Sequence, residues 1–222
     1  MPFSDRNDAG RQLARALERF RGADAVVLAL PHGGVPVAAE VARHLGLPLD
    51  LLLVRKIGVP GHAELAMGAV IDGNRPIAVR NEDVIRFAGV TPADFNRAYN
   101  AALAELERRR GRYLAGRAAL PLAGRTAILV DDGIATGATV KAAIKGLRRR
   151  QPAAIVLATP VAPPDRVDAL RPLVDEIVCL ERPAFFRALS LHYADFPQIE
   201  DEDVLALLDA AKTRTTSREP IE

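Results

Sequence analysis

Two adjacent carboxylates, Asp131 and Asp132, directly follow the short apolar run Ala127–Val130. Such a run of branched residues is typical of a buried strand. A loop of small residues comes next, with Gly133 and the segment 135–139, and a helical pattern of apolar residues follows it. We expect this strand, loop and helix start to form an anion site, because free backbone N–H groups and the positive end of the helix dipole point into such loops.

Two acids beside a phosphate-binding loop need compensation, because like charges repel. A ligand with both phosphate and hydroxyl groups, accompanied by a divalent cation, supplies it. The loop then holds the phosphate, while the carboxylates accept hydrogen bonds from a sugar diol or from metal-bound waters. The loop is not a Walker loop, because the Gly-Lys-Ser/Thr ending is missing, and the chain has no Gly-x-Gly-x-x-Gly dinucleotide fingerprint.

Residues 127–139 resemble the phosphoribosyl-pyrophosphate (PRPP) motif of type I phosphoribosyltransferases, in which two acids and a small-residue loop precede Thr-Gly-x-Thr. The alternative is the strand of a response-regulator receiver, which also ends in paired Asp. A receiver, however, places that strand at its start and lacks the Thr-Gly-x-Thr loop. The resemblance implies transfer of a 5-phosphoribosyl group from PRPP to a nitrogenous base or related acceptor, with release of pyrophosphate.

The same resemblance implies roles for the residues of the motif. Asp131 and Asp132 would hold the ribose diol, and the 5′-phosphate would lie in the loop made of Ala135, Thr136, Gly137, Ala138 and Thr139. Mg²⁺ would come with PRPP and lie near the two acids. Because Mg²⁺ keeps most of its ligands as waters and substrate oxygens, we expect no dedicated protein cage for it.

A second strand, glycine turn and helix occur earlier, where the apolar run 25–30 leads into Pro31, His32, Gly33 and Gly34. The resemblance implies that this turn binds pyrophosphate through His32, Gly33 and Gly34 and holds a non-proline cis peptide bond. The alternative is a plain connection between a strand and a helix.

A further buried strand is predicted over 49–54, and it ends at Arg55 and Lys56. Basic residues at the carboxyl end of a parallel strand lie beside the ligand crevice of an open α/β sheet. The resemblance assigns these two residues to pyrophosphate as well. A solvated strand end is the alternative.

Segment 57–67 shows no clean period, and its position matches the flexible loop that closes over the active site in this family and excludes water. Hypoxanthine-type enzymes carry a carboxylic acid, used as a base, where this chain has Ala135. If a base is needed, Glu64 is the first candidate and His62 the second, since both suit proton transfer. The alternative is that both are solvated loop residues.

Alternation of strands with helices predicts an α/β fold with a mainly parallel sheet and helices on both faces. We expect one domain over 1–222, with a core at about 22–182, a small hood at about 183–212 that also uses N-terminal residues, and a disordered tail at 213–222. A hairpin around 72–74, a helix over 91–113 and a final helix over 202–211 complete the pattern. Aromatic residues of the hood either stack on the acceptor or pack the tail onto the core; these are Phe186, Tyr193 and Phe196.

Composition limits the classes of partner. Apolar residues make up 49% and charged residues 26% of the 222 residues, and the net charge is only +2. No strong field therefore draws the whole protein to nucleic acid or to a membrane, no apolar segment is long enough to span a bilayer, and we expect a cytoplasmic protein. The resemblance is compatible with a homodimer. The alternative function is a PRPP-sensing regulator that binds nucleic acid through the clusters 108–112 and 148–150.

Overall fold

The computed structural model describes residues 2–72, 76–114 and 119–216, and the chain divides into two compact units. Unit 1 combines the segments 1–51, 120–137 and 150–222, and unit 2 combines 52–119 and 138–149. The prediction of one domain with a C-terminal hood stays a prediction.

Unit 1 is built on a five-stranded parallel sheet, which confirms the predicted α/β fold. The central strand pair is buried over almost its whole length, because parallel strands covered on both faces are made of continuous apolar runs. The strand order is β2-β1-β6-β7-β8. The strands are β1 (Ala25–Ala29), β2 (Leu49–Leu51), β6 (Thr126–Val130), β7 (Ala154–Val161) and β8 (Glu176–Glu181).

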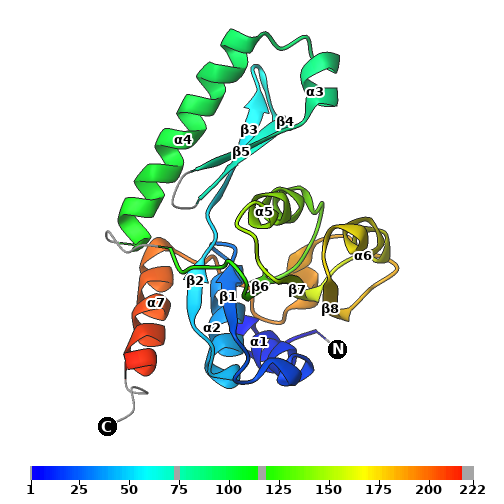
Figure 1. Ribbon diagram of the computed structural model, residues 1–222. Coiled ribbons are helices and arrows are strands. Elements are labelled where there is room, and N and C mark those ends of the chain that lie inside the picture. The colour runs from blue at the N-terminus through cyan, green and yellow to red at the C-terminus, as the bar shows by residue number, and fades with distance from the viewer. Residues whose placement is uncertain (1, 73–75, 115–118, 217–222) are drawn as a thin grey trace. The chain divides into compact units, whose positions relative to one another are not determined.

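Helices cover both faces of this sheet. Figure 1 shows α1 and α2 on one face and α6 on the other, and α7 lies beside α2. The helices of unit 1 are α1 (Arg6–Ala16), α2 (Gly34–Leu45), α6 (Pro164–Leu170) and α7 (Asp201–Thr216), with 3₁₀ turns η1 (Glu18–Phe20), η2 (Arg171–Leu173) and η3 (Leu189–His192). No helix in the described ranges is both long and apolar enough to cross a bilayer.

Two sequence predictions about unit 1 are wrong in their bounds. The predicted strand 49–54 ends at Leu51, because its parallel neighbour β1 ends at Ala29, the residue that pairs with Leu51. The following apolar residues belong to unit 2. The predicted disordered tail begins too early, since α7 continues to Thr216.

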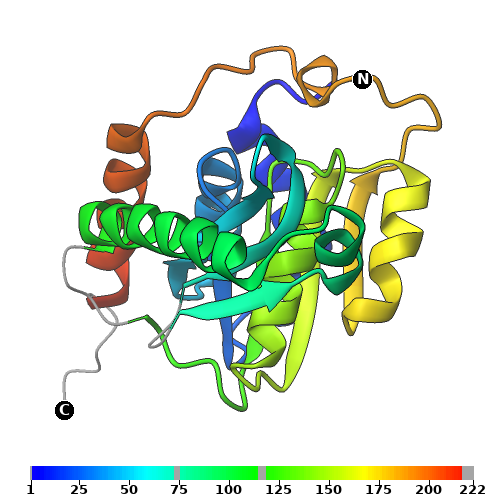
Figure 2. The same cartoon turned by 90° about the horizontal axis from the view of Figure 1, so that it is seen from above.

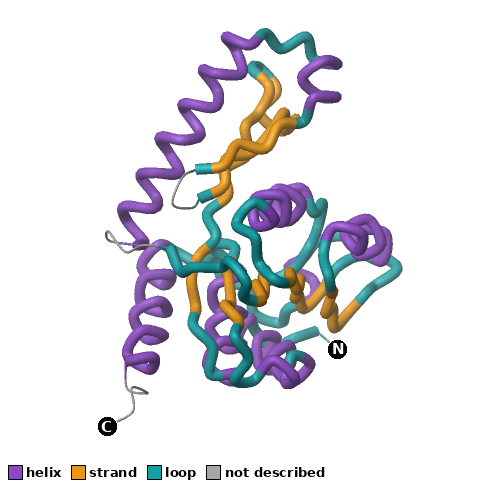
Figure 3. The backbone as a smooth tube through the Cα atoms, viewed as in Figure 1, coloured by secondary structure: helices purple, strands orange, loops and turns teal. Residues whose placement is uncertain are grey.

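Unit 2 contains a three-stranded antiparallel sheet in the order β3-β4-β5. Figure 3 shows α4 along one side of these strands and α5 on the other. The elements are β3 (Val54–Val59), β4 (His62–Ile71), β5 (Ile77–Arg80), α3 (Glu82–Phe87), α4 (Pro92–Leu114) and α5 (Ala138–Arg148).

The hairpin predicted around 72–74 is confirmed by the antiparallel pairing of β4 with β5, although its turn residues 73–75 lie outside the described residues. Segment 57–67, whose sequence shows no clean period, has regular strand pairing, and its role as a closing loop stays a prediction. Val59 pairs with His62 across the turn Pro60-Gly61, so the segment is a second β-hairpin. Irregular register near Gly58 hides the strand period in the sequence.

Helices α1 and α2 pack closely, and Gly10 of α1 is the point of contact. A Cβ atom at Gly10 would lie 2.7 Å from the Cβ of Glu40 and 2.8 Å from the carbonyl oxygen of Val37. Gly111 of α4 is a matched helical glycine, because a Cβ atom there would meet nothing within 4 Å.

We predict that Gly10→Ala lowers the free energy of unfolding by about 1–3 kcal/mol, because the added methyl group overpacks the helix contact. Gly111→Ala should instead raise it by up to about 1 kcal/mol, because alanine is the better helix former. Urea unfolding followed by circular dichroism measures both. Equal stability of the Gly10→Ala variant and the wild type would show that this contact is loose.

Candidate functional site

The two glycine-containing loops predicted from the sequence leave the sheet side by side. Strands β1 and β6 are parallel neighbours, and Ala29 pairs with Val130 at their carboxyl ends. The N–H of Leu30 donates to the carbonyl of Val130 at 3.0 Å, which holds the two exits together. The peptide bond between Pro31 and His32 is cis, as the family resemblance implied.

The turn after β1 lies directly against the two acids. A Cβ atom at Gly33 would overlap Oδ2 of Asp132, and one at Gly34 would be 2.9 Å from the carbonyl oxygen of Val130. Both positions therefore need glycine because of close approach and not because of backbone conformation. The sequence signal at Gly33 and Gly34 thus reflects contact between this turn and the acids.

Asp132 is bound by a cation from the start of the chain. Nε of Arg6 lies 2.8 Å from Oδ2 of Asp132, and the two residues are only 8% and 7% exposed. Arg6 also donates through Nη1 to the carbonyl of Pro197 at 2.7 Å, and its guanidinium carbon lies 3.7 Å from the ring centroid of Phe196. The sequence alone predicted that a ligand compensates the charge of the two acids, and in the structure Arg6 supplies part of that compensation.

The segment between β8 and α7 covers the beginning of the loop that follows β6. The hydroxyl of Tyr193 donates to the carbonyl of Asp132 at 2.5 Å. A Cβ atom at Gly133 would overlap a methyl carbon of Leu189, so the Leu189 side chain rests on the loop backbone. Figure 2 shows this segment passing beside the N-terminal segment, and Phe3 pairs there with Tyr193.

The electrostatics of the two acids differ. Removal from water raises the pKa of Asp131 well above its ordinary value, and the neighbouring charge of Asp132 raises it further. Burial also raises the pKa of Asp132, but the hydrogen bond and charge of Arg6 oppose that shift. The carboxylate of Asp131 accepts a hydrogen bond from the backbone N–H of Asp132 at 3.0 Å. Asp132 is therefore the acid that the fold holds with a cation.

The phosphate-binding loop predicted at 135–139 runs through the end of unit 1 into unit 2 along the chain. Its start is anchored, because the N–H of Ile134 donates to the carbonyl of Val161 at 2.9 Å. Ala135 and Thr136 are exposed. Gly137 has φ of +76°, a left-handed conformation that favours glycine. The last two residues of the predicted loop, Ala138 and Thr139, begin α5 and are exposed.

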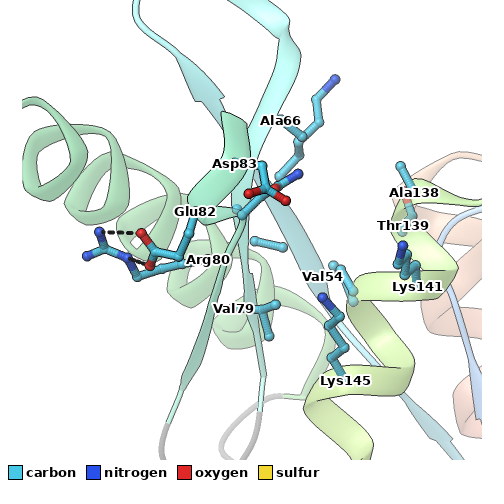
Figure 4. A pocket seen from close by; sticks show the side chains of 15 residues that line it. Val54, Ala66, Val79, Arg80, Glu82, Asp83, Ala138, Thr139, Lys141 and Lys145 are labelled. Atoms are coloured by element: carbon cyan, nitrogen blue, oxygen red, sulfur yellow. Dashed lines mark hydrogen bonds and ion pairs between the residues drawn. The ribbon is translucent and has the colours of Figure 1, made fainter. Parts of the chain in front are cut away.

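Unit 2 contains a cavity of about 440 Å³ between its sheet and α5. Figure 4 shows Lys141 and Lys145 on the α5 side of the cavity and Asp83 on the opposite side. Arg80 and Glu82, which also line it, form an ion pair in which Nε and Oε1 are 2.7 Å apart. Ala138, Thr139 and Lys56 also line the cavity, so it includes residues from two predicted phosphate-binding segments.

The remaining predicted residues are spread over both units. In unit 1 the His32 ring lies 3.0 Å from Oδ1 of Asp201, and Phe186 stacks on His192 with ring centroids 5.3 Å apart. Tyr193 is 5% exposed, and its ring lies between those of Phe3 and Phe196. For Tyr193 and Phe196 this contact favours packing of the tail onto the core over stacking on an acceptor.

Arg55 and Lys56 lie in strand β3 of unit 2 and are exposed. The interpretation that they end a parallel strand is therefore wrong, because β3 belongs to the antiparallel sheet. His62 begins β4 and is exposed, whereas the side chain of Glu64 lies outside the described part of the structure.

Sequence reasoning missed Arg6 and the contacts of Leu189 and Tyr193. Arg6 is separated from Asp132 by 126 positions and Tyr193 by 61. In the sequence Arg6 is one of several basic residues near an amphipathic helix. The only available signal was the need for a cation beside two adjacent acids, and it pointed equally well to a metal ion.

We predict that Asp131→Asn stabilises the protein at neutral pH and not in acid. A carboxyl group whose pKa is raised by folding holds its proton more tightly in the folded state. Stability is therefore lost as the pH rises above the unfolded pKa of about 3.9 and towards the folded pKa. Asparagine removes this loss. Urea unfolding should show a gain on the order of 1 kcal/mol at pH 8 and none at pH 3.5.

Asp132→Asn is the matched comparison and should have the opposite effect. Arg6 stays charged at all accessible pH values, so losing its carboxylate partner leaves a buried charge unpaired. We expect the free energy of unfolding at pH 8 to fall by about 3–5 kcal/mol. If both Asn variants moved stability in the same direction, the distinction between the two acids would be wrong.

Comparison with known proteins identifies the family. The model of the phosphoribosyl transferase domain matches residues 6–195. Two curated proteins of Mycobacterium tuberculosis, from strains CDC 1551 and H37Rv, are each 48% identical over 209 residues, or 94% of this chain. Both are named as phosphoribosyl transferases whose assignment is provisional. The chain spans about half the length of these curated relatives, since the match covers 47% of each.

A solved structure has the same fold over nearly the whole chain. The crystal structure of TT1426 from Thermus thermophilus is 42% identical, with a TM-score of 0.82, and the match covers 94% of this chain and 98% of that one. The family resemblance noted at 127–139 is confirmed by the match over most of the chain. The chain belongs to the phosphoribosyl transferase domain family.

Proposed function

We propose that this protein transfers the 5-phosphoribosyl group of PRPP to a nitrogenous base or a related acceptor and releases pyrophosphate. The observation that carries the proposal is the contact of the Gly33 turn with Asp132 where β1 and β6 end. Ligands of open α/β sheets bind at the carboxyl ends of the strands. Membership of the phosphoribosyl transferase domain family supports the same reaction.

The proposed roles follow the positions of the loops. Asp131 and Asp132 accept hydrogen bonds from the ribose diol, and the loop 135–139 holds the 5′-phosphate through backbone N–H groups and threonine hydroxyls. The turn 32–34 takes pyrophosphate. Because the His32 ring is engaged with Asp201, we assign pyrophosphate binding there to the backbone. Arg55 and Lys56 remain the proposed cationic partners of pyrophosphate.

Mg²⁺ is the metal ion that the family implies, and the donor set fits a loosely held ion. Among the described residues no cluster of three or more His, Cys, Asp or Glu side chains is placed to cage a metal ion. One oxygen of Asp132 already receives the Arg6 N–H. Asp131 would therefore contact waters of an ion carried by PRPP, and the second oxygen of Asp132 would stay available to the ribose diol. When bound, Mg²⁺ neutralises pyrophosphate charge.

The chemistry required of the protein is mainly positioning. The bond from the anomeric carbon to the pyrophosphate oxygen breaks, that oxygen keeps the electron pair, and an acceptor nitrogen forms the new bond with its lone pair. As in glycoside hydrolysis, positive charge develops on the sugar ring in the transition state. In this proposal the two acids stabilise that charge. The acceptor proton passes to a base, for which Glu64 and then His62 remain our candidates.

We do not extend the proposal to a nucleic-acid-binding regulator. Arg108 and Arg109 both pair with Glu105 at 2.8 and 2.9 Å, and their hydrogen bonds lower the pKa of Glu105 to about 2. Arg149 donates to the carbonyl of Ala78, and Arg150 donates to that of Leu120. Much of the donor capacity of the two basic clusters is therefore used within the chain.

We predict that the wild-type protein releases pyrophosphate from PRPP with Mg²⁺ in the presence of one member of a panel of purine and pyrimidine bases and amines. Asp131→Asn should lower kcat/KM by about 100- to 1000-fold, as is typical for loss of one transition-state electrostatic contact. The control is Asp168→Asn, the same change at an exposed acid of α6. If Asp131→Asn and Asp168→Asn retain equal activity, the assignment is wrong.

We also predict that Gly33→Ala weakens PRPP binding at least 10-fold, because its methyl group would displace the Asp132 carboxylate. Gly111→Ala has open space around it and should bind PRPP as the wild type does. Isothermal titration with PRPP and Mg²⁺ measures both affinities. Unchanged affinity of the Gly33→Ala variant would place the sugar-binding site elsewhere.

A further inference from the structure

The geometry points to Arg6 as a positioning residue for phosphoribosyl transfer, which holds the Asp132 carboxylate in the orientation that receives the ribose diol. This inference rests on the proposed function. Arg6 comes from the first turn of α1 and reaches a loop at the end of β6, inside unit 1. It contacts the Asp132 carboxylate directly, so we infer that it acts through this acid.

Three contacts fix the guanidinium group of Arg6 in place. Nε donates to Oδ2 of Asp132 at 2.8 Å, Nη1 donates to the carbonyl of Pro197 at 2.7 Å, and the flat face lies 3.7 Å from the centre of the Phe196 ring. A planar group held at two edges and one face has a single orientation. That orientation fixes Oδ2 of Asp132 and leaves Oδ1 as the oxygen that we assign to a ribose hydroxyl.

The backbone of Asp132 is held from the other end of the chain. Tyr193 donates to the Asp132 carbonyl at 2.5 Å, and Leu189 rests on the neighbouring Gly133. We call residues 3–6 and 189–197 the end strap. Its two halves are joined by backbone hydrogen bonds from Phe3 to His192 at 2.9 Å, from Ala194 to Phe3 at 2.7 Å and from Asp195 to Ser4 at 2.9 Å.

The negative charges of Asp131 and Asp132 give a reason for the presence of Arg6 beside them. Two adjacent carboxylates repel each other, and burial raises the pKa of both. Arg6 opposes this shift most directly at Asp132, the acid to which it donates. A buried ion pair gives little net stability compared with apolar packing, so stability does not explain its presence. Orientation of an acid that must meet two hydroxyl groups explains it, because a displacement of about 1 Å costs about 100-fold in rate.

A double-mutant cycle tests the inference on the full chain with PRPP and Mg²⁺ as the titrant. Arg6→Gln should weaken PRPP binding by about 10- to 100-fold, and Asp132→Asn should weaken it by a similar factor. The double variant should bind no more weakly than Asp132→Asn alone, because Arg6 acts only through that acid. It should also regain part of the stability that Asp132→Asn loses.

Two conservative variants keep the test decisive if Arg6→Gln does not fold. Arg6→Lys keeps the charge but not the planar fork, so it should bind PRPP with an affinity between those of the wild type and Arg6→Gln. Tyr193→Phe keeps the ring packing and removes the hydrogen bond to Asp132, and it should weaken binding at least 3-fold. Arg11→Gln, an exposed position of the same helix, is the control and should bind like the wild type.

The possible results separate two failures. Wild-type protein that does not bind PRPP would refute the proposed function itself. Wild-type binding together with either unchanged affinity in the folded Arg6 variants, or losses that simply multiply in the double variant, would refute the positioning role of Arg6 and leave the proposed function standing. Non-additive losses of PRPP affinity in the double variant, with intermediate affinity in Arg6→Lys, support both the proposed function and the positioning role of Arg6.

Discussion

The contact between the Gly33 turn and the Asp132 carboxylate is the constraint on which the rest of unit 1 depends. Two parallel neighbours, β1 and β6, end together, and the chain that leaves one strand lies against an acid that leaves the other. No side chain fits between them, so the acid cannot be neutralised from that side. The compensating charge has to come from another direction, and Arg6 at the start of α1 supplies it.

This arrangement separates the roles of the two acids. The carboxylate of Asp132 accepts a hydrogen bond from Arg6 and lies against Gly33, and its backbone carbonyl accepts a hydrogen bond from the hydroxyl of Tyr193. Asp131 shares the buried site, and its pKa is raised most by loss of water and then by its neighbour. Acids with a strongly shifted pKa are typical of functional sites. A neutral residue at such a position would make the protein more stable. The site therefore combines one acid that a cation holds in place with one acid whose charged form burial disfavours.

The parts of the fold that could be predicted are those with local causes. Apolar runs predicted the buried strands β1 and β6, and the acids with their small-residue loop predicted the family. Predictions failed where a partner elsewhere sets the outcome. The strand at 49–54 stops at Leu51 because β1 offers no partner beyond Ala29, and the second hairpin is concealed by a register shift near Gly58.

The same distinction explains why the motif alone does not describe the site. Residues 127–139 specify which groups are present, and they say nothing about which oxygen of Asp132 is available. That choice is made by Arg6, by Tyr193 and by Leu189, from the two ends of the chain. Backbone hydrogen bonds join Phe3 and Ser4 to 192–195, so each half of the end strap supports the other in its contact with the acid. Orientation of the site is therefore a property of the whole of unit 1, whereas its chemistry is local.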